Sequence, residues 1–290
     1  MQRIRKDHIM AEILKGGPVA KALSEQLLEK SEKLKAQGII PTLAILRVGE
    51  NESDLAYERG ILSRCEKTGV TPRRIILPAD ASQEAVEAEI IKINEDPSVH
   101  AALMFRPLPK HLDERKICEL LDPMKDADCM TQASLATVFT GKGAGYAPCT
   151  AQAVMELLSF YGIDPKGKNV AVIGRSLVIG RPVAMLLMSA NATVTICHTR
   201  TVNMEEITKR ADIIVAAAGK AKVVTASYLC PGQTVIDVGI NVDESGNLCG
   251  DVDFDAAQDI VGAITPVPGG VGNVTTAVLC KHVIEAACQI

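Results

Sequence analysis

Two glycines, Gly174 and Gly180, flank a short polar loop that follows an apolar, β-branched run beginning at Asn169. The loop carries Arg175 and Ser176 and leads into a helix-like segment. A strand that enters a helix through a glycine turn points backbone N–H groups and the positive end of the helix dipole at one place, which suits a phosphate. Because the spacing differs from the common G-x-G-x-x-G fingerprint, an ordinary strand–turn–helix stays an alternative for this segment alone.

A second apolar run, residues 193–198, ends where an NAD site usually places an acidic residue for the ribose hydroxyls. The chain instead continues with Thr199 and Arg200, and the next acidic residue is Glu205. Hydroxyls and a guanidinium suit a 2′-phosphate. We therefore expect the cofactor to be NADP rather than NAD. His198 either faces the cofactor phosphate or lies in solvent at the end of the strand.

Composition narrows the class of protein. The chain has 290 residues and a formal net charge of −4, so no nucleic-acid partner and no acidic membrane surface is expected. The nine cysteines include no C-x-x-C pair and the five histidines no H-x-x-x-H spacing, so neither a disulfide framework nor a metal site is predicted. The charged N-terminus lacks the apolar core of a signal peptide, and no run of eighteen apolar residues occurs. We expect a cytoplasmic protein.

The elements that position these residues alternate between helix and strand in two blocks, which predicts an α/β protein whose second block is a Rossmann-like, doubly wound parallel sheet. Ser82 is the expected N-cap of one helix. The segment 264–272, dense in Pro and Gly, is expected to be a loop outside the core. Helices are predicted over 18–36, 52–67, 82–94, 114–121, 152–161, 183–188 and 275–288, and strands over 42–48, 74–77, 101–105, 169–173, 193–198, 213–219 and 234–240.

Five motifs occur in order along the chain: Val172-Ile-Gly-Arg-Ser176, Cys197-His-Thr-Arg-Thr201, Asp237-Val-Gly-Ile-Asn241, Gly250-Asp-Val and the segment 264–272. Together they resemble the bifunctional methylenetetrahydrofolate dehydrogenase/cyclohydrolase family, over nearly the whole chain. The resemblance implies two α/β domains that face each other across a cleft, and a homodimer. Residues 1–148, joined by a C-terminal helix at 273–290, would form a folate-binding catalytic domain, and residues 149–272 an NADP-binding Rossmann domain.

The resemblance also assigns roles to individual residues. Tyr57 matches the tyrosine that lies against the folate, and Asp128 matches the aspartate that hydrogen-bonds the pterin ring, so both are the expected catalytic and substrate-binding residues. Pro268 and Gly269 match the loop that shapes the substrate cleft. The cofactor residues implied in the same way are Gly174, Arg175, Ser176, Thr199, which keeps the hydroxyl of the family's usual serine, and Ile240 on the nicotinamide side; Arg200 joins them on its charge.

Two departures from the family change the expected chemistry. The family places a lysine four residues after the tyrosine, on the same helical face, and a glutamine that hydrogen-bonds it. Here Ile61 stands at the lysine position and Phe105 at the glutamine position. Losing the lysine alone would leave a buried amide without its partner, at about 1–3 kcal/mol, whereas replacing both residues avoids that penalty. Ile61 and Phe105 together therefore indicate an apolar site without an unpaired polar group.

The two reactions of the family need different groups. Dehydrogenation moves a hydride from the folate methylene carbon to NADP⁺, and positioning and electrostatics suffice for it. Cyclohydrolysis adds water to the methenyl carbon and must move protons, which an isoleucine and a phenylalanine cannot do. The sequence predicts an NADP-dependent methylenetetrahydrofolate dehydrogenase whose cyclohydrolase activity is weak or lost.

Two other functions fit the same residues. Substitutions in the expected cleft, among them Arg106, Cys129 and Asn273, would also suit a non-catalytic folate- or nucleotide-binding paralogue. Alternatively, hydride transfer is kept and the substrate differs, with Arg106 meeting a carboxylate such as a folate glutamate tail. Arg106 could equally be a solvated residue before a proline.

Overall fold

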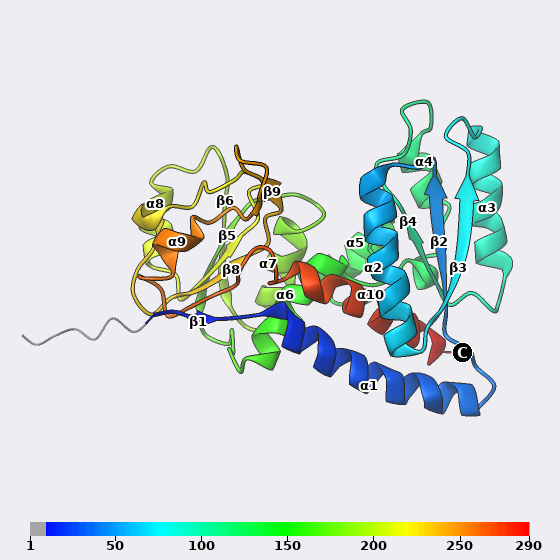
Figure 1. The fold of residues 1–290 in the computed structure, drawn as a ribbon, viewed down its shortest axis with the longest axis horizontal. Helices are drawn as coiled ribbons and strands as arrows, with labels where there is room; N and C mark the ends of the chain where they lie inside the picture. Colours follow the sequence, from blue (N-terminus) through cyan, green and yellow to red (C-terminus); the bar gives the residue numbers. More distant parts are fainter. Residues whose placement is uncertain (1–9, 290) are drawn as a thin grey trace, which may run out of the picture. The chain divides into compact units, whose positions relative to one another are not determined.

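The computed structural model describes residues 10–289, and its internal contacts divide the chain into two compact units. Unit 1 combines the chain up to Val19 with Ala153–Val274, and unit 2 combines Ala20–Gln152 with the chain from Thr275 onward. Figure 1 shows the elements of each unit coloured along the sequence. This division differs from the expected boundaries at the N-terminus, which the sequence placed in the first domain.

A short strand explains that difference. Strand β1 (Glu12–Ile13) pairs in parallel with β11 (Ala263–Ile264), and the Leu14 backbone N–H donates to the Ile264 carbonyl at 2.8 Å. The N-terminal segment is therefore hydrogen-bonded into the sheet of unit 1. The same pairing corrects the expectation for the 264–272 segment, because Ile264 is fully buried in that sheet and only the residues after it form the loop.

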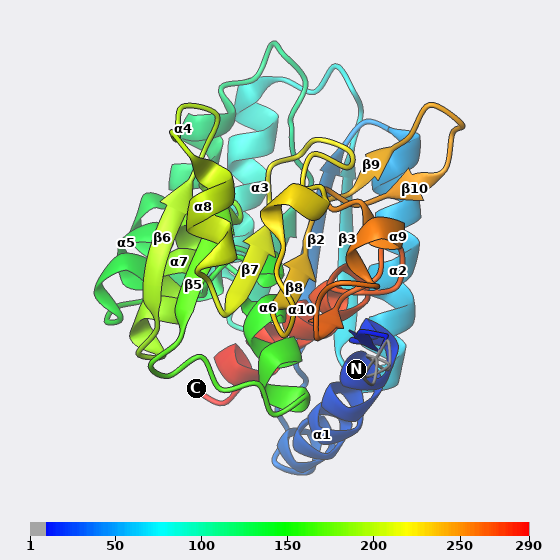
Figure 2. The same ribbon diagram turned by 90° about the vertical axis from the view of Figure 1, so that its left-hand side faces the viewer.

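Unit 1 is built on a six-stranded parallel sheet in the order β1-β11-β8-β7-β5-β6. The chain starts at β5 (Asn169–Ile173), moves outward to β6 (Thr193–Cys197), and then crosses back to β7 (Ile213–Ala216) and β8 (Thr234–Asp237). Figure 2 shows these four strands side by side. The reversal between β5 and β7 is the place where a doubly wound sheet binds ligands. The predicted doubly wound parallel sheet is confirmed.

Buried β-branched residues hold this sheet together. Every residue of β7 is buried, as are four of the five residues of β5, which explains why both strands appear in the sequence as continuous apolar runs. Helix α7 (Gly180–Ser189) packs against β5 and β6. The remaining elements of unit 1 are α8 (Met204–Lys209), η2 (Ala226–Tyr228), α9 (Phe254–Ala257), most of α6 (Cys149–Phe160), and the antiparallel pair β9 (Asn241–Val242) and β10 (Leu248–Cys249).

Unit 2 contains a three-stranded parallel sheet in the order β3-β2-β4. The central strand β2 (Thr42–Val48) is buried along its whole length, while β4 (Ala101–Met104) and β3 (Thr71–Leu77) flank it. Strand β3 begins three residues before the predicted strand. The sequence missed these first residues because they are exposed and carry no apolar pattern.

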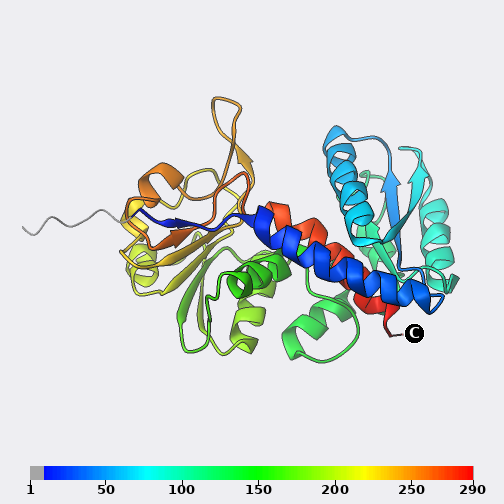
Figure 3. The ribbon, with the colours of Figure 1, turned by 60° about the horizontal axis from the view of Figure 1, so that its bottom comes forward.

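Helices surround the sheet of unit 2. The predicted N-cap is confirmed, because the Ser82 hydroxyl accepts a hydrogen bond from the Ala85 backbone N–H at 3.2 Å. Gly69 ends α2 in the left-handed conformation at φ 72°, as glycine does most easily. Figure 3 shows α1 and α10 running beside each other. The elements are α1 (Gly16–Ala36), α2 (Glu52–Thr68), α3 (Gln83–Glu95), α4 (Glu114–Glu119), η1 (Pro123–Lys125), α5 (Gln132–Thr140) and α10 (Gly272–Ala287).

Within residues 10–289, no helix combines the length and the apolar character needed to cross a membrane. All nine cysteines lie in this range as free thiols, and seven of them are buried. In the same part of the chain no three His, Cys, Asp or Glu side chains lie close enough together to hold a metal ion.

Candidate functional site

Tyr57 and Phe105 meet in unit 2. Tyr57 lies in the first half of α2, and Phe105 follows directly after β4, at the carboxyl end of the parallel sheet. Their ring centroids lie 5.9 Å apart with the planes at 81°, an edge-to-face contact. Phe105 is buried, whereas Tyr57 is 40% exposed. The phenylalanine therefore supports one edge of a tyrosine whose remaining surface is open to a ligand.

The phenol of Tyr57 lies in a dense environment. Burial raises its pKa well above the usual value, and the Cys149 thiol and the Asp128 carboxylate raise it further. A hydrogen bond with Thr275 opposes these effects. None of these influences is a cation, so the phenol stays protonated at neutral pH and serves as a neutral hydrogen-bonding group.

Ile61 lies one helical turn after Tyr57 and is completely buried. It belongs to the buried face of α2 together with Glu58, Cys65 and Thr68. The position where the family carries a lysine is therefore packed inside unit 2. An ammonium group at this place would need a hydrogen-bonding partner, because an unpaired buried charge is strongly unfavourable.

Asp128 lies in the same unit and is held by the backbone. Its Oδ1 accepts a hydrogen bond from the Cys149 backbone N–H at 2.7 Å. Burial raises the pKa of Asp128, and the hydrogen bonds from Cys149 and the charge of Arg106 act against that rise. The carboxyl group therefore has a fixed orientation and lies near both Tyr57 and Arg106.

Two charged neighbours shape the loop that carries Asp128. The Asp126 carboxylate is completely buried and accepts hydrogen bonds from the Met130 and Thr131 backbone N–H groups at 2.9 and 2.8 Å. The Lys125 ammonium donates to three backbone carbonyls at 2.7–2.9 Å. Asp126 is bonded within the loop and Lys125 ties the loop to the end of α3, so the role of both charges is structural.

Cys129, next along this loop, adopts the left-handed backbone conformation at φ 58°, where the family's glycine would meet no strain. Burial raises the pKa of its thiol to about 12, and burial also raises the pKa of the Cys197 thiol. Raised pKa values leave both groups as unreactive thiols. Both cysteines therefore act as small packing residues.

Two arginines lie near the tyrosine in sequence or in space. Arg64, two turns after Tyr57 on α2, donates to the Ser24 hydroxyl at 2.8 Å, and also to the Ala20 carbonyl and the Thr276 hydroxyl at 3.3 Å each. Its guanidinium thus links α2 to α1 and α10. Arg106, directly after Phe105, is half-buried and acts electrostatically on Asp128.

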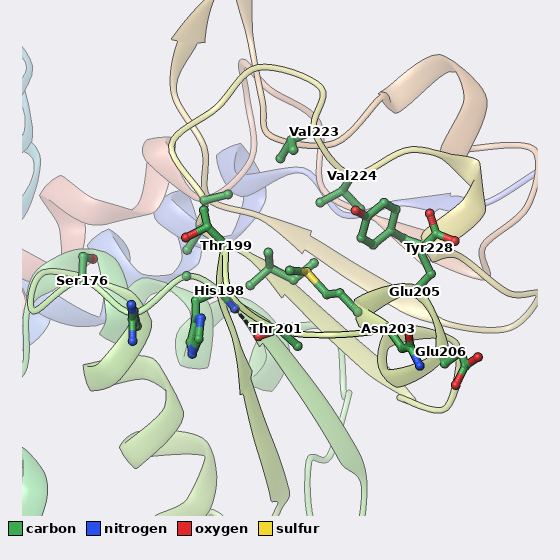
Figure 4. A pocket seen from close by; sticks show the side chains of 16 residues that line it. Ser176, His198, Thr199, Thr201, Asn203, Glu205, Glu206, Val223, Val224 and Tyr228 are labelled. Carbon is green, nitrogen blue, oxygen red and sulfur yellow. Dashed lines mark hydrogen bonds between the residues drawn. The ribbon is translucent and has the colours of Figure 1, made fainter.

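Unit 1 holds a separate pocket of about 810 Å³ at the carboxyl ends of β5, β6 and β7. Gly174, Arg175 and Ser176 line it, as do His198 and Thr199. Figure 4 shows Ser176, His198 and Thr199 on one side and Val223, Val224 and Tyr228 across from them. The predicted phosphate loop and the end of the second strand therefore do meet at one place. The location is the switch point of the doubly wound sheet.

The glycines of the loop are required by its close packing. A Cβ added to Gly174, which has φ 132°, would lie 2.0 Å from the Ala217 carbonyl oxygen. A Cβ on Gly180 would lie 2.3 Å from the Gly174 carbonyl oxygen. The Ser176 hydroxyl accepts from the Ile179 backbone N–H at 3.2 Å at the start of α7, whose first turn carries no acidic residue. The loop suits the phosphates of a dinucleotide.

The predicted role of Arg200 is not supported by its position. A tight turn follows β6, in which the Thr201 hydroxyl accepts from the His198 backbone N–H at 2.8 Å and His198 Nδ1 accepts from the Arg200 N–H at 3.1 Å. Arg200 is exposed at this turn and does not line the pocket, whereas Thr199 and Thr201 do. Neighbouring residues of a tight turn point in different directions, which the sequence pattern did not resolve.

The pocket also contains residues that the sequence analysis missed or set aside. Glu205 and Glu206 lie along its edge, and the Glu205 carboxylate accepts a hydrogen bond from the Ser227 hydroxyl at 2.8 Å. Met204 and Tyr228 contribute apolar lining. No sequence motif marks these side chains, because α8 and the 3-10 turn η2 are too short to show periodicity.

A second hollow of about 220 Å³ in unit 1 brings together Ile240, Pro268 and Gly269. These residues come from the segment after β8 and from the Pro/Gly-rich loop before α10. The sequence resemblance assigned Ile240 to the nicotinamide side of the cofactor and the other two to the substrate cleft, and the three lie around one space.

Asp237 lines this hollow, and a second buried carboxylate, Asp251, lies next to it in the fold. Asp237 accepts from the Gly239, Asp251 and Val252 backbone N–H groups at 2.9–3.0 Å. Asp251 accepts from the Gly219 and Lys220 backbone N–H groups at 3.0 Å each. Burial raises the pKa of Asp237 to about 6. Backbone donors rather than cations hold both carboxylates, which fixes the loops that carry Ile240.

Comparison with known proteins gives matches over nearly the whole chain. The catalytic domain of tetrahydrofolate dehydrogenase/cyclohydrolase matches residues 14–128, and the NAD(P)-binding domain of the same family matches residues 148–290. Relatives named bifunctional protein FolD include those of Carboxydothermus hydrogenoformans, 52% identical, and Clostridium kluyveri, 50% identical. These matches cover 97% and 96% of this chain and 98% of each relative.

Solved structures that resemble this chain come from the same family. The bifunctional FolD enzyme of Campylobacter jejuni superposes with a TM-score of 0.93 at 36% identity, covering 96% of this chain and 99% of that one. The Trypanosoma brucei FolD, solved with NADP cofactor and inhibitor, gives a TM-score of 0.89 at 36% identity and covers 97% of this chain and 98% of that one. The chain therefore belongs to the tetrahydrofolate dehydrogenase/cyclohydrolase family.

Proposed function

We propose that this family member is an NADP-dependent methylenetetrahydrofolate dehydrogenase in one-carbon metabolism, and that its cyclohydrolase activity is weak or lost. One observation carries the second half of the proposal. Ile61 is completely buried one turn from Tyr57, and Phe105 contacts the tyrosine ring where the family's lysine–glutamine pair would stand.

The residues that remain suit hydride transfer. NADP⁺, when bound, supplies the carbon that accepts the hydride from the folate methylene group. The Tyr57 ring offers its exposed surface to the folate, and the Asp128 carboxylate, oriented by the Cys149 N–H, hydrogen-bonds the pterin. The glycine loop binds the cofactor phosphates, and Arg175 with Thr199 binds the 2′-phosphate. Placing the two reactants is the main task of these side chains.

Cyclohydrolysis requires more than placement. Water adds to the methenyl carbon and loses a proton, and the ring nitrogen gains one as the C–N bond breaks. Neither Ile61 nor Phe105 can donate or accept a proton, and Tyr57 has a raised pKa that makes it a poor acid. The Arg64 guanidinium is hydrogen-bonded to Ala20 and Ser24 of α1 and to Thr276 of α10.

A coupled spectrophotometric assay tests both halves of the proposal. Purified protein mixed with methylenetetrahydrofolate and NADP⁺ should form NADPH. The methenyl product should then disappear no faster than it does by uncatalysed hydrolysis. Rapid conversion to formyltetrahydrofolate would refute the loss of cyclohydrolase. Absence of NADPH with retained folate binding would instead favour a non-catalytic paralogue.

We also propose that the protein is a cytoplasmic homodimer. Among residues 10–289, strand β6 pairs with β5 alone and leaves one edge of the six-stranded sheet open, which supports assembly through unit 1. Light scattering on the purified protein should give twice the chain mass of 30.9 kDa, and a monomer at micromolar concentration would contradict the dimer.

A further inference from the structure

Two charged residues, Arg47 and Glu58, are buried in the middle of unit 2. Arg47 lies on the central strand β2 and is 2% exposed, and Glu58, on α2, is also 2% exposed. Arg47 Nε and Glu58 Oε2 lie 3.3 Å apart. Every other residue of β2 is uncharged, so Arg47 is the one charge in that strand. Burying two charges is costly unless they pair well, which raises the question of what this pair does.

A second arginine completes the arrangement. Arg74, on the edge strand β3, donates through Nε to Glu58 Oε1 at 2.6 Å, and its side chain is about half exposed. The Glu58 carboxylate thus lies between two arginines from different strands: Arg74 hydrogen-bonds one oxygen, and Arg47 Nε lies beside the other at ion-pair distance without a hydrogen bond. These contacts fix α2 against two strands of the sheet at one residue.

Arg47 also reaches the turn that starts the helix. Its Nη1 donates to the Gly49 carbonyl, and Gly49 has φ 83°, a conformation that glycine adopts readily. Two residues later the Asn51 side chain caps α2 by accepting from the Ser53 backbone N–H at 3.1 Å. One guanidinium therefore connects the end of β2, the turn and the helix.

Glu58 directly follows Tyr57, and Ile61 lies one turn after Glu58 on the same buried face. We infer that Arg47, Glu58 and Arg74 form a clamp that sets the rotation of α2 and so positions Tyr57 for the folate. This inference rests on the proposed function only for the identity of the ligand. Arg47 and Glu58 are positioning residues, because they touch the helix and the turn rather than the substrate.

Hydrophobic packing alone would hold α2 less specifically. Apolar contacts are non-directional, whereas the hydrogen bond from Arg74 is directional and the neighbouring charge of Arg47 favours the same place for the Glu58 carboxylate. Glu58 directly follows Tyr57 on α2. A small change in the rotation of this helix therefore moves the Tyr57 side chain. Misplacing a substrate contact by about 1 Å can reduce a rate about 100-fold.

Steady-state kinetics of Glu58→Gln and Arg47→Met test this inference. The KM for methylenetetrahydrofolate should rise about ten-fold or more, and the KM for NADP⁺ should stay unchanged because the cofactor pocket lies in unit 1. Arg73→Met is the matched control. Arg73 neighbours Arg74 on β3 but pairs at the surface with Asp96, so this variant should keep both KM values.

A change in the amount of folded protein would lower the apparent kcat without changing either KM. The double variant Arg47→Met/Glu58→Met removes both charges with side chains that pack well, which protects the fold if a single variant fails to express. A raised folate KM in this folded double variant supports the clamp. A wild-type folate KM in the double variant would show that packing alone positions the tyrosine and would overturn the inference.

A readout that needs no activity separates this inference from the proposed function. The chain has four tyrosines and no tryptophan, so protein labelled with 3-fluorotyrosine should give four ¹⁹F resonances, with that of Tyr57 assigned by Tyr57→Phe. The Tyr57 resonance should shift in Glu58→Gln and stay in place in Arg73→Met. An unshifted resonance refutes the clamp, whereas an inactive wild-type protein with a shifted resonance refutes only the proposed function.

Discussion

The ring of Phe105 meets the ring of Tyr57 edge-on, with the centroids 5.9 Å apart. Phe105 comes from the end of β4 and Tyr57 from α2, so the contact joins the sheet of unit 2 to this helix. With Ile61 buried beside them, the three side chains form an apolar corner. Under the proposed function, this corner offers no proton donor at the position where hydrolysis would need one.

Restoring the family's pair should restore hydrolysis. In Ile61→Lys/Phe105→Gln the amide provides a partner for the buried ammonium, and the rate of methenyl hydrolysis should rise by about 100-fold, within the usual range for general acid–base help. The rate is followed by the loss of methenyl absorbance.

Ile61→Lys alone should instead lose stability by about 3 kcal/mol or more, because its charge is buried without a partner. Ile61→Met/Phe105→Leu is the matched control and should leave hydrolysis unchanged. Equal hydrolysis rates in the double variant and in this control would show that the apolar corner does not limit the reaction.

The cofactor preference should depend on the residues that line the pocket in unit 1. Arg175→Met and Thr199→Val remove a guanidinium and a hydroxyl from that lining. Each should raise the KM for NADP⁺, by about ten-fold for the arginine, because a hydrogen bond to a charged group contributes about 1.5–3 kcal/mol. The KM for NAD⁺ should change little.

Arg200→Met is the matched control for that measurement. Arg200 is exposed on the turn after β6 and does not line the pocket, so its removal should leave both KM values close to those of the wild type. A large rise in the NADP⁺ KM for Arg200→Met, with none for Arg175→Met, would reverse the assignment.

The sequence predicted the parallel sheet of unit 1 well, because β5 and β7 are buried on both faces and appear as continuous apolar runs. It did not predict β1, because two residues carry no periodicity and the partner strand lies 250 residues away. Helix α5 was also missed. Its polar first residues show no clear apolar stripe, and the Thr131 side chain that caps it is recognised only in the structure.

The candidate site shows the same division. The glycine loop was predictable from residue types, since close backbone approach demands glycine. For the buried pair of Arg47 and Glu58, the sequence shows only that Arg47 is a single charge within an apolar strand. That Glu58 is its partner depends on how α2 packs. The direction in which Arg200 points depends on the turn geometry, which no spacing rule specifies.

Gly174 should tolerate no side chain. In Gly174→Ala the new Cβ would lie 2.0 Å from the Ala217 carbonyl oxygen, at a φ of 132° that alanine rarely adopts. The strand–helix loop must then shift, so NADP affinity should fall at least ten-fold in a fluorescence titration, with a loss of stability above 1 kcal/mol. Gly232 also has a positive φ, 83°, but nothing lies within 4 Å of the Cβ that Gly232→Ala would add. This substitution should cost only about 1 kcal/mol and leave NADP binding unchanged.

Asp237 should make stability depend on pH. Its pKa rises from 3.8 in the unfolded chain to about 6 in the folded protein, chiefly through burial. Below pH 3.8 the group is protonated in both states and costs nothing. As pH rises toward 6, the unfolded state releases its proton first, so the free energy of unfolding should fall by about 3 kcal/mol and then level off. Urea unfolding between pH 4 and 7.5 measures this decline. Asp237→Asn cannot ionise, so the variant should lack this part of the pH dependence. Parallel curves for the two proteins would show that Asp237 does not titrate in this range.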